Sequence, residues 1–216
     1  MLNAVIFDLD GTLVDSEVIW HEVTQEIVES FGKEFDDSIH TELLGASGPV
    51  CMNILKERFN LPAEVEELLK MNNAIFDRKI KVQLPPKKEG ADALMESLRA
   101  SQIPYALATS GNRSMVEYVL SGHGWLEHFH AVVTLEDVEN PKPASDIYDE
   151  ALRRLGFDAA TCVAFEDAIA GVKSAQAAGI KVVGMANAYA GNALEIADRQ
   201  IQSFEEVNIN DLRNLL

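Results

Sequence analysis

Short apolar segments recur along the chain, and longer segments with the period of an amphipathic helix separate them. The apolar segments with the length of strands are 4–9, 103–108, 131–134, 161–165 and 180–185. The first and the last are apolar at almost every position, which is typical of strands that helices cover on both faces. Alternating strands and helices favour a parallel sheet. The pattern therefore predicts an α/β fold built on a doubly wound parallel sheet.

One long interval breaks this alternation, because residues 16–84 show only helical patterns. Its candidate helices are 17–31, 48–59 and 62–80. We expect this interval to form a small inserted helical cap domain, while residues 1–15 and 85–216 form the catalytic core. The segment LPPKKEG at 84–90 is the expected return connection, because its prolines and glycine break regular structure.

The composition limits the possible partners. The 216 residues carry a formal net charge of −17, which disfavours binding to nucleic acid or to an anionic membrane surface, since both need clustered Lys and Arg. No apolar run approaches the roughly 20 residues that span a bilayer, and the N-terminus has no export pattern. Cys51 and Cys162 lie far apart, so we expect reduced thiols. We therefore expect a cytoplasmic monomer that acts on a small molecule, with no nucleic-acid or membrane partner.

Acidic residues follow the first and the fourth apolar segments. Asp8 and Asp10 close the first, and Glu166 and Asp167 close the fourth. Ligands of parallel sheets bind beyond the carboxyl ends of the strands, and carboxylates gathered there repel one another unless a cation intervenes. Hard oxygen ligands of this kind suit Mg²⁺. We therefore expect a Mg²⁺ cofactor at these four residues, and leave open whether Glu166 binds it directly or through water.

The two aspartates of the first segment have different expected roles. Asp8, once its charge is partly neutralised, can attack a phosphorus atom as a nucleophile. Asp10 lies two residues further on, so its side chain points the same way but one step further out. It can donate a proton to the leaving oxygen and later activate water. We expect Thr12 to hold Asp10 by a hydrogen bond.

A candidate anion site follows the second strand. The hydroxyl of Thr109 and the amides of Ser110 and Gly111 precede a helix that starts near Asn112, and the N-terminus of a helix binds anions well. Lys142, after the third strand, would cancel negative charge on Asp8 and on a phosphate. We expect Thr109 and Lys142 to be catalytic beside the two aspartates. The expected phosphate ligands are Thr109, Ser110, Gly111, Asn112 and Lys142, and such a set suits phosphoryl transfer.

These residues occur in an order that is known from one superfamily. The run DLDGTLVDS at 8–16, Thr109 at its strand end, Lys142 in NPKP and the run FEDAIAG at 165–171 resemble the four successive motifs of the haloacid dehalogenase (HAD) phosphohydrolases. The resemblance covers about residues 4–185. It implies a HAD-like Rossmannoid core, Mg²⁺ and an aspartyl-phosphate intermediate.

The inserted helical segment resembles a particular kind of cap. Its position directly after the first motif is similar to that of the small C1-type helical cap in the subfamily that includes β-phosphoglucomutase and many sugar-phosphate phosphatases. Such caps open and close over the active site. We expect residues 45–49 to approach the site on closure, so Ala46 and Ser47 are candidate substrate contacts.

The expected function is Mg²⁺-dependent hydrolysis of a small phosphorylated metabolite, with a sugar phosphate as the first candidate. One alternative is a β-phosphoglucomutase-like mutase, which the resemblance disfavours because Thr12 and Gly48 stand where that enzyme has valine and arginine. Asp10 disfavours the dehalogenase and phosphonatase branches, which lack it. A non-catalytic phosphoacceptor or binding domain is the other alternative, but an insertion of about 70 residues would then have no purpose.

Overall fold

The computed structural model describes residues 1–43, 48–186 and 195–216. The chain forms two compact units. The core unit comprises Met1–Asp15 and Pro86–Leu216, and the inserted unit comprises Ser16–Pro85. The catalytic role of the first unit and the cap role of the second stay predictions.

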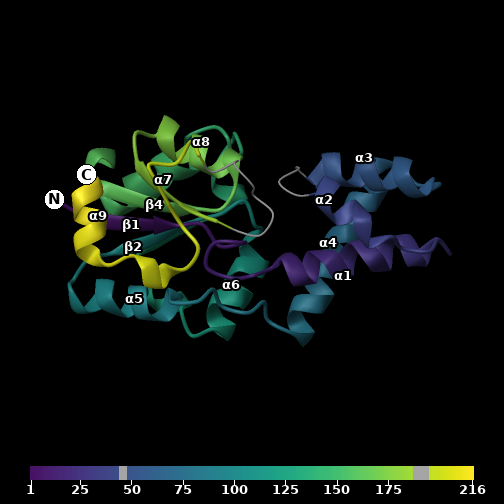
Figure 1. Ribbon diagram of the computed structural model, residues 1–216, viewed down its shortest axis with the longest axis horizontal. Helices are drawn as coiled ribbons and strands as arrows, with labels where there is room; N and C mark the ends of the chain where they lie inside the picture. The colour runs from purple at the N-terminus through teal and green to yellow at the C-terminus, as the bar shows by residue number, and fades with distance from the viewer. Residues whose placement is uncertain (44–47, 187–194) are drawn as a thin grey trace. The chain divides into compact units, whose positions relative to one another are not determined.

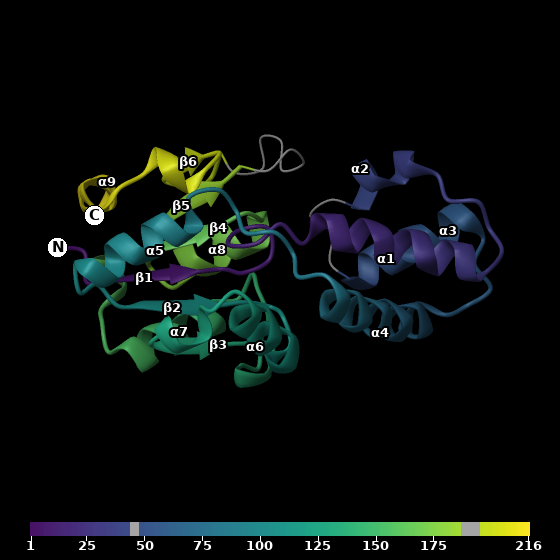
Figure 2. The same ribbon diagram turned by 90° about the horizontal axis from the view of Figure 1, so that it is seen from below.

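The core unit is built on a six-stranded sheet in the order β3-β2-β1-β4-β5-β6. Its strands are β1 Ala4–Phe7, β2 Tyr105–Ala108, β3 Ala131–Val133, β4 Cys162–Glu166, β5 Lys181–Met185 and β6 Arg199–Ile201. Every neighbouring pair is parallel. Figure 2 shows the succession from β3 at one edge to β6 at the other. The predicted doubly wound parallel sheet is therefore confirmed.

Helices cover both faces of this sheet. They are α5 Ala91–Ala100, α6 Arg113–Gly122, α7 Asp146–Leu155, α8 Ile169–Ala177 and α9 Ile209–Leu215. Side chains of α7 and α8 pack with Ala4 and Ile6 of β1 in one core cluster, whereas Phe7 stacks on Phe165 and meets Phe204 on the opposite face. Figure 1 shows α8 and α5 on opposite sides of the sheet. β1 is therefore buried on both faces, as its continuous apolar sequence predicts.

The order of the strands creates a switch point beside β1. The chain runs from β1 to β2 and β3 on one side, and then returns to place β4 on the other side of β1. Phe7 lies opposite both Leu107 and Phe165, and the Asp8 amide donates to the Phe165 carbonyl at 3.0 Å. Residues that follow these strands therefore meet at one edge, where ligands of such sheets bind.

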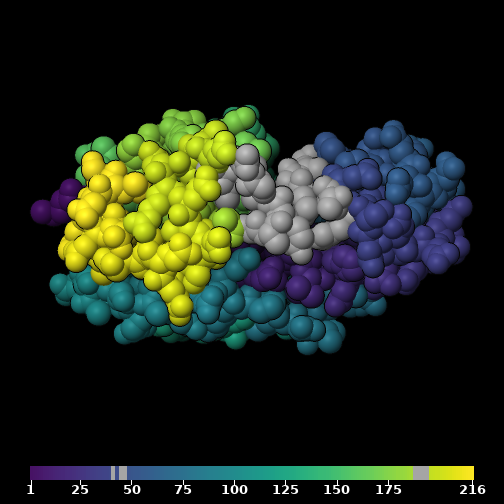
Figure 3. All heavy atoms as spheres, viewed as in Figure 1, coloured from purple at the N-terminus to yellow at the C-terminus, as the bar shows by residue number. Residues whose placement is uncertain are grey.

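The sixth strand was not predicted from the sequence. β6 has only three residues, and its arginine and glutamine leave Ile201 as the one buried side chain. Such a short edge strand lacks the apolar run that identifies a strand in the sequence. In the chain beyond it lie the 3₁₀ turn Phe204–Glu206 and α9, and Figure 3 shows this C-terminal segment, in yellow, beside α5, in teal.

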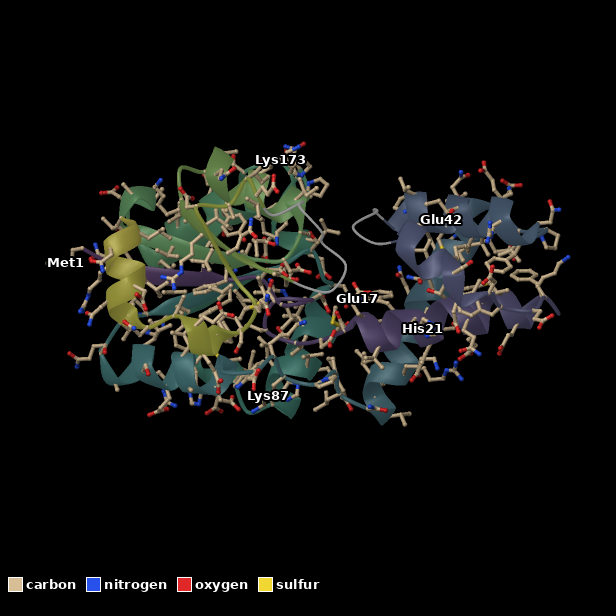
Figure 4. All side chains as sticks on the ribbon, in the orientation of Figure 1. Met1, Glu17, His21, Glu42, Lys87 and Lys173 are labelled. Carbon is tan, nitrogen blue, oxygen red and sulfur yellow. The ribbon has the colours of Figure 1, made fainter. Side chains whose placement is uncertain are left out.

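The inserted unit consists of helices in its described part. They are α1 Glu17–Ser30, the 3₁₀ turn Asp37–Ile39, α2 His40–Leu43, α3 Gly48–Phe59 and α4 Val65–Val82. The Trp20 ring of α1 stacks on the Phe76 ring of α4 at a centroid distance of 3.8 Å. His21, labelled on α1 in Figure 4, forms a hydrogen bond between its Nε2 and Asp37 Oδ1 at 3.0 Å. The helical pattern of the sequence is thus realised, with α4 starting three residues later than expected.

The two segments that connect the units are paired within the core unit. The Asp15 amide donates to the Pro86 carbonyl at 2.7 Å, and the Lys88 amide donates to the Leu13 carbonyl at 2.9 Å. Lys87, labelled in Figure 4, forms an antiparallel bridge with Val14. The chain therefore leaves and re-enters the core unit through one hydrogen-bonded pair of segments. None of the described helices combines the length and apolar character needed to cross a membrane.

Candidate active site

Three acidic side chains gather beyond the carboxyl ends of β1 and β4. Asp8, Glu166 and Asp167 each offer an oxygen, and these oxygens lie within 4.8 Å of one another. Asp8 follows β1, Glu166 closes β4 and Asp167 comes next, so the neighbouring positions of the two strands bring them together. The side chains of Asp8 and Glu166 are only 8% and 1% exposed. The cluster is thus largely removed from water.

Lys142 joins this cluster from the loop before α7. Its Nζ donates to Asp8 Oδ1 at 2.7 Å, to Glu166 Oε1 at 2.5 Å and to the Ala108 carbonyl at 3.0 Å. The side chain is 7% exposed, in contrast to the exposed Lys173 on α8 that Figure 4 labels. One ammonium therefore links the ends of β1, β2 and β4.

The cluster holds more negative than positive charge. Burial raises the pKa of Asp8 above its usual value, although the Lys142 ammonium opposes the change. Burial also raises the pKa of Asp167 well above its usual value, and the charges of Asp8 and Glu166 raise it further. The pKa of Glu166 rises to about 7, mainly through burial, again against the effect of Lys142. Three carboxylates around one ammonium make a site that favours an added cation.

The charge of Lys142 is secured by its neighbours. Burial by itself lowers the pKa of an ammonium, because the charged form loses its hydration. The carboxylates of Asp8 and Glu166 more than offset this cost, and the pKa of Lys142 lies above its usual value. The lysine therefore stays protonated and can neutralise charge beside Asp8.

Two glycines provide the space that the acids fill. Gly11 has φ +80°, and a Cβ added there would lie 2.0 Å from Asp167 Oδ2. A Cβ at Gly171 in α8 would lie 1.9 Å from Glu166 Oε2. Because atoms that are not bonded to each other cannot approach so closely, any side chain at either position would displace a carboxylate. The conformations of Asp167 and Glu166 thus depend on glycines in neighbouring segments.

Asp10 and Thr12 follow Asp8 in the same turn. Asp10 is half-buried, and its charge contributes to raising the pKa of Asp167, so it lies near the cluster. The prediction that Thr12 holds Asp10 is wrong, because the buried Thr12 hydroxyl has no hydrogen-bond partner among the residues that the structure describes. It lies beside Asp8 instead, where it favours the charged form of that carboxyl and so opposes, in small part, the burial that raises the pKa of Asp8. The tight turn at Gly11 directs the two side chains to different places.

The segment after β2 is fixed by hydrogen bonds to β3 and by bonds within the segment. The Thr109 amide donates to the Val133 carbonyl at 3.1 Å, and the Thr109 hydroxyl accepts from the Gly111 amide at 3.2 Å. Asn112 is the N-cap of α6, and its Oδ1 accepts from the Met115 amide at 2.9 Å. The predicted anion cradle is therefore a preformed start of a helix. Phosphate binding by Thr109, Gly111 and Asn112, and by Ser110 between them, stays a prediction.

Two candidate substrate contacts cannot be placed beside these residues. Ala46 and Ser47 lie outside the described residues, which resume at Gly48 in α3. Their expected approach to the substrate stays a prediction.

One residue of this site was missed from the sequence. Tyr148 in α7 is fully buried, and its hydroxyl donates to Glu166 Oε1 at 2.5 Å. Burial raises the pKa of Tyr148 well above its usual value, and the charge of Glu166 adds to the effect, so the hydroxyl keeps its proton. The only signal in the sequence is an aromatic residue on the apolar face of a helix, shared with Ile147 and Ala151, and this is typical of core packing.

Comparison with known proteins agrees with this geometry. The family model described as haloacid dehalogenase-like hydrolase matches residues 5–185, which hold β1 except its first residue, β2 to β5 and every side chain of the acidic cluster. The chain belongs to this family. It is therefore a haloacid dehalogenase-type hydrolase, and the resemblance of its four motifs is confirmed.

Named relatives of this hydrolase include phosphatases. The bifunctional riboflavin kinase/FMN phosphatase of Arabidopsis thaliana is 31% identical over 183 residues, which cover 84% of this chain and 48% of that protein. The chain thus spans about half the length of that relative. The phosphorylated carbohydrates phosphatase of Thermotoga maritima is 30% identical over 182 residues, 83% of each chain.

A solved structure has the same fold over almost its whole length. It is a mutant of CbbY from Rhodobacter sphaeroides in complex with xylulose-(1,5)bisphosphate. The TM-score is 0.78 at 25% identity, with 98% of this chain and 99% of that chain covered. The haloacid dehalogenase fold is therefore present from the first strand to the last.

Proposed function

We propose that this hydrolase is a Mg²⁺-dependent phosphatase. It cleaves the ester bond of a small phosphorylated metabolite, first of all a sugar phosphate, through an aspartyl-phosphate on Asp8. The observation that carries the proposal is the buried Asp8 carboxylate, held 2.7 Å from the Lys142 ammonium within the acidic cluster. The names of the Arabidopsis and Thermotoga relatives support a phosphate ester as the substrate.

The acidic cluster suits a magnesium ion. Its donors are hard carboxylate oxygens, they are largely buried, and they exceed the local positive charge. Asp8 and Asp167 would hold the ion, and Glu166 would contribute directly or through water. Asp10, expected from the sequence as a further ligand, lies outside this three-residue cluster, and its carboxyl is assigned to proton transfer instead. Bound there, Mg²⁺ would supply positive charge that balances the charge of the substrate phosphate.

In the first step, an Asp8 carboxylate oxygen attacks the phosphorus atom and the bond from phosphorus to the leaving oxygen breaks. Asp10 gives its proton to that leaving oxygen, so the alcohol departs neutral. Lys142 keeps Asp8 in place and offsets charge on the phosphate oxygens. Thr109 and the amides of the following segment bind the phosphate oxygens at the start of α6.

In the second step, water attacks the phosphorus of the aspartyl-phosphate while Asp10, now a carboxylate, takes a proton from that water. The bond between phosphorus and the Asp8 oxygen breaks and inorganic phosphate leaves. The cycle consumes one water and restores Asp10 in its protonated form. Asp10 therefore acts as an acid first and as a base afterwards.

The test is the release of inorganic phosphate from a panel of sugar phosphates, nucleotides and other phosphorylated metabolites, with and without Mg²⁺. We expect release that requires Mg²⁺ and that Asp8→Asn lowers by about 10³-fold or more. Asp158→Asn is the matched control, because Asp158 lies before the opposite end of β4, and it should keep the wild-type rate. Near wild-type release by Asp8→Asn would refute the proposal, and an isomerised phosphosugar as the main product would indicate a mutase.

The same panel tests the proposed role of the inserted unit as the cap that selects the substrate. Loops and insertions on a fixed catalytic scaffold commonly set specificity. Replacing Ala46, Ser47 and Gly48 together should change the relative rates across the panel. Unchanged relative rates would show that this segment does not select the substrate.

A further inference from the structure

The Glu166 carboxylate is held from three sides within the core unit. Its Oε1 accepts from Lys142 Nζ and from the Tyr148 hydroxyl, each at 2.5 Å. Its Oε2 lies against the backbone of α8, where only a glycine at position 171 leaves room. The side chain is 1% exposed, so water does not compete for these contacts. The carboxylate is thus fixed in one orientation.

This arrangement connects Tyr148 to the reacting group. The Tyr148 hydroxyl donates to Glu166, Glu166 accepts from Lys142, and Lys142 donates to Asp8 at 2.7 Å. The Lys142 Nζ also lies 5.4 Å from the centre of the Tyr148 ring, so the ring restricts the position of the ammonium from a second direction. A lysine has a long flexible stem, and a fixed second anchor restricts where its ammonium can go.

We propose that Tyr148 is a positioning residue, whose hydroxyl fixes Glu166 so that Glu166 keeps the Lys142 ammonium against Asp8. The inference rests on the proposed function for its effect on rate, but its geometry does not. The hydrogen bond of the Tyr148 hydroxyl goes to Glu166, so the tyrosine acts on Asp8 through Glu166 and Lys142. An ammonium displaced by even a fraction of an ångström would balance charge at the transition state less well.

The chain offers a matched control for this proposal. Tyr105 in β2 is also fully buried in the core unit, but its hydroxyl has no hydrogen-bond partner among the described residues. Tyr105→Phe and Tyr148→Phe therefore remove the same atom from two buried rings, and only the second breaks a contact to the site. Both variants keep the ring that fills the core, so both are expected to fold.

The first measurement compares the steady-state kinetics of the two variants with a phosphate ester that the wild type hydrolyses. Tyr148→Phe should lower kcat by about 10-fold to 100-fold and leave KM within about twofold, whereas Tyr105→Phe should change neither. In a Glu166→Gln background, adding Tyr148→Phe should have almost no further effect, because the tyrosine acts through that residue. A Tyr148→Phe enzyme with the wild-type kcat would overturn the proposal, as would effects that multiply in the double variant.

The second measurement needs no turnover. The ¹⁵N and ¹H signals of the Lys142 ammonium are recorded by NMR in the metal-free protein. Tyr148→Phe should shift these signals and speed the exchange of their protons with water, and Tyr105→Phe should not. Should the wild type release no phosphate from any ester, the proposed function fails and these signals alone decide on the positioning role. Unchanged Lys142 signals in Tyr148→Phe would then overturn it.

Discussion

Gly11 and Gly171 determine where two acidic side chains of the site can lie. Neither glycine offers a functional group, yet a methyl group at either position would overlap Asp167 or Glu166. Gly11 also has φ +80°, a backbone conformation that residues other than glycine rarely adopt. The geometry of the site therefore depends on the absence of a side chain at these two positions as well as on the acidic groups themselves.

The consequence can be tested by comparing Gly11→Ala with Gly124→Ala. Both glycines have positive φ, +80° and +74°, but nothing lies within 4 Å of the Cβ position at Gly124. Each variant should lose about 1 kcal/mol of unfolding free energy through backbone strain, and Gly11→Ala should lose more because its methyl group overlaps Asp167. Gly11→Ala alone should weaken Mg²⁺ binding, by about 10-fold to 100-fold, because it displaces Asp167. Calorimetric titration of Mg²⁺ and denaturant unfolding measure the two effects, and equal Mg²⁺ affinities would contradict this account.

The segment after β2 is braced by the element that follows β3, the 3₁₀ turn η3 at Leu135–Asp137. The Leu135 amide donates to the Gly111 carbonyl at 3.4 Å, and the Arg113 amide donates to Glu136 Oε1 at 3.0 Å. Asp137 Oδ2 accepts from Arg113 Nη2 at 2.5 Å. These contacts fix the start of α6, where phosphate binding is proposed.

Asp137 joins this turn to α7 as well. Its Oδ1 accepts from Arg154 Nη2 at 2.8 Å, and its Oδ2 accepts from the Thr134 amide at 2.8 Å. Partial burial raises the pKa of Asp137, but the Thr134 amide and the arginines outweigh it, and the pKa lies below its usual value. The carboxylate therefore stays charged at neutral pH and holds β3, α6 and α7 together.

Replacing this charge tests the brace. Asp137→Asn should lower the unfolding free energy by about 1–3 kcal/mol, because two arginines lose a charged acceptor. It should also raise the inhibition constant of inorganic phosphate by about threefold to tenfold, because phosphate binds less tightly when the start of α6 is less firmly held. Glu96→Gln in α5 is the control, because the exposed Glu96–Arg99 pair is worth little. Unchanged phosphate inhibition in Asp137→Asn would mean that the turn does not support the phosphate site.

The sequence predicts the central strands well, but it does not predict the edge strand or the contacts between distant segments. The central strands β1 and β4 are apolar up to the acidic residues of the site, and their ends were predicted within two residues, because burial on both faces leaves a continuous apolar run. β6 lies at the edge of the sheet and contains two polar residues, so it has no apolar run by which the sequence could reveal it. The brace around Asp137 and the contact of Tyr148 with Glu166 join segments 24 and 18 residues apart, so no local pattern encodes them.

The site residues show the same limit. Asp8, Lys142, Glu166 and Asp167 follow strands, and the topology of a parallel sheet is enough to predict that they meet. The Thr12 hydroxyl does not form the expected hydrogen bond with Asp10, because the positive φ of Gly11 turns the chain between the two residues. Strand periodicity predicts the direction of a side chain only while the strand continues.

For the whole molecule, the net charge of −17 sets the conditions for an anionic substrate. The long-range field repels such a substrate, although salt at physiological strength screens it beyond about 8 Å. Attraction must therefore come from groups at the site, which are the Lys142 ammonium, the start of α6 and the proposed Mg²⁺. An acidic surface with a locally balanced site suits a small substrate that can reach the cluster, rather than an extended polyanion.

The central claim is that the Asp8 carboxylate attacks phosphorus, and trapping the covalent intermediate tests it most directly. The protein is mixed with acetyl phosphate and Mg²⁺, quenched in acid, reduced with borohydride and digested for mass spectrometry. Asp10→Asn, which has lost the base that activates water, is run beside the wild type to let the intermediate accumulate. We predict homoserine in place of aspartate at position 8 alone, formed only when Mg²⁺ is present. Continued release of phosphate with position 8 unmodified, or modification at another residue, would contradict the account.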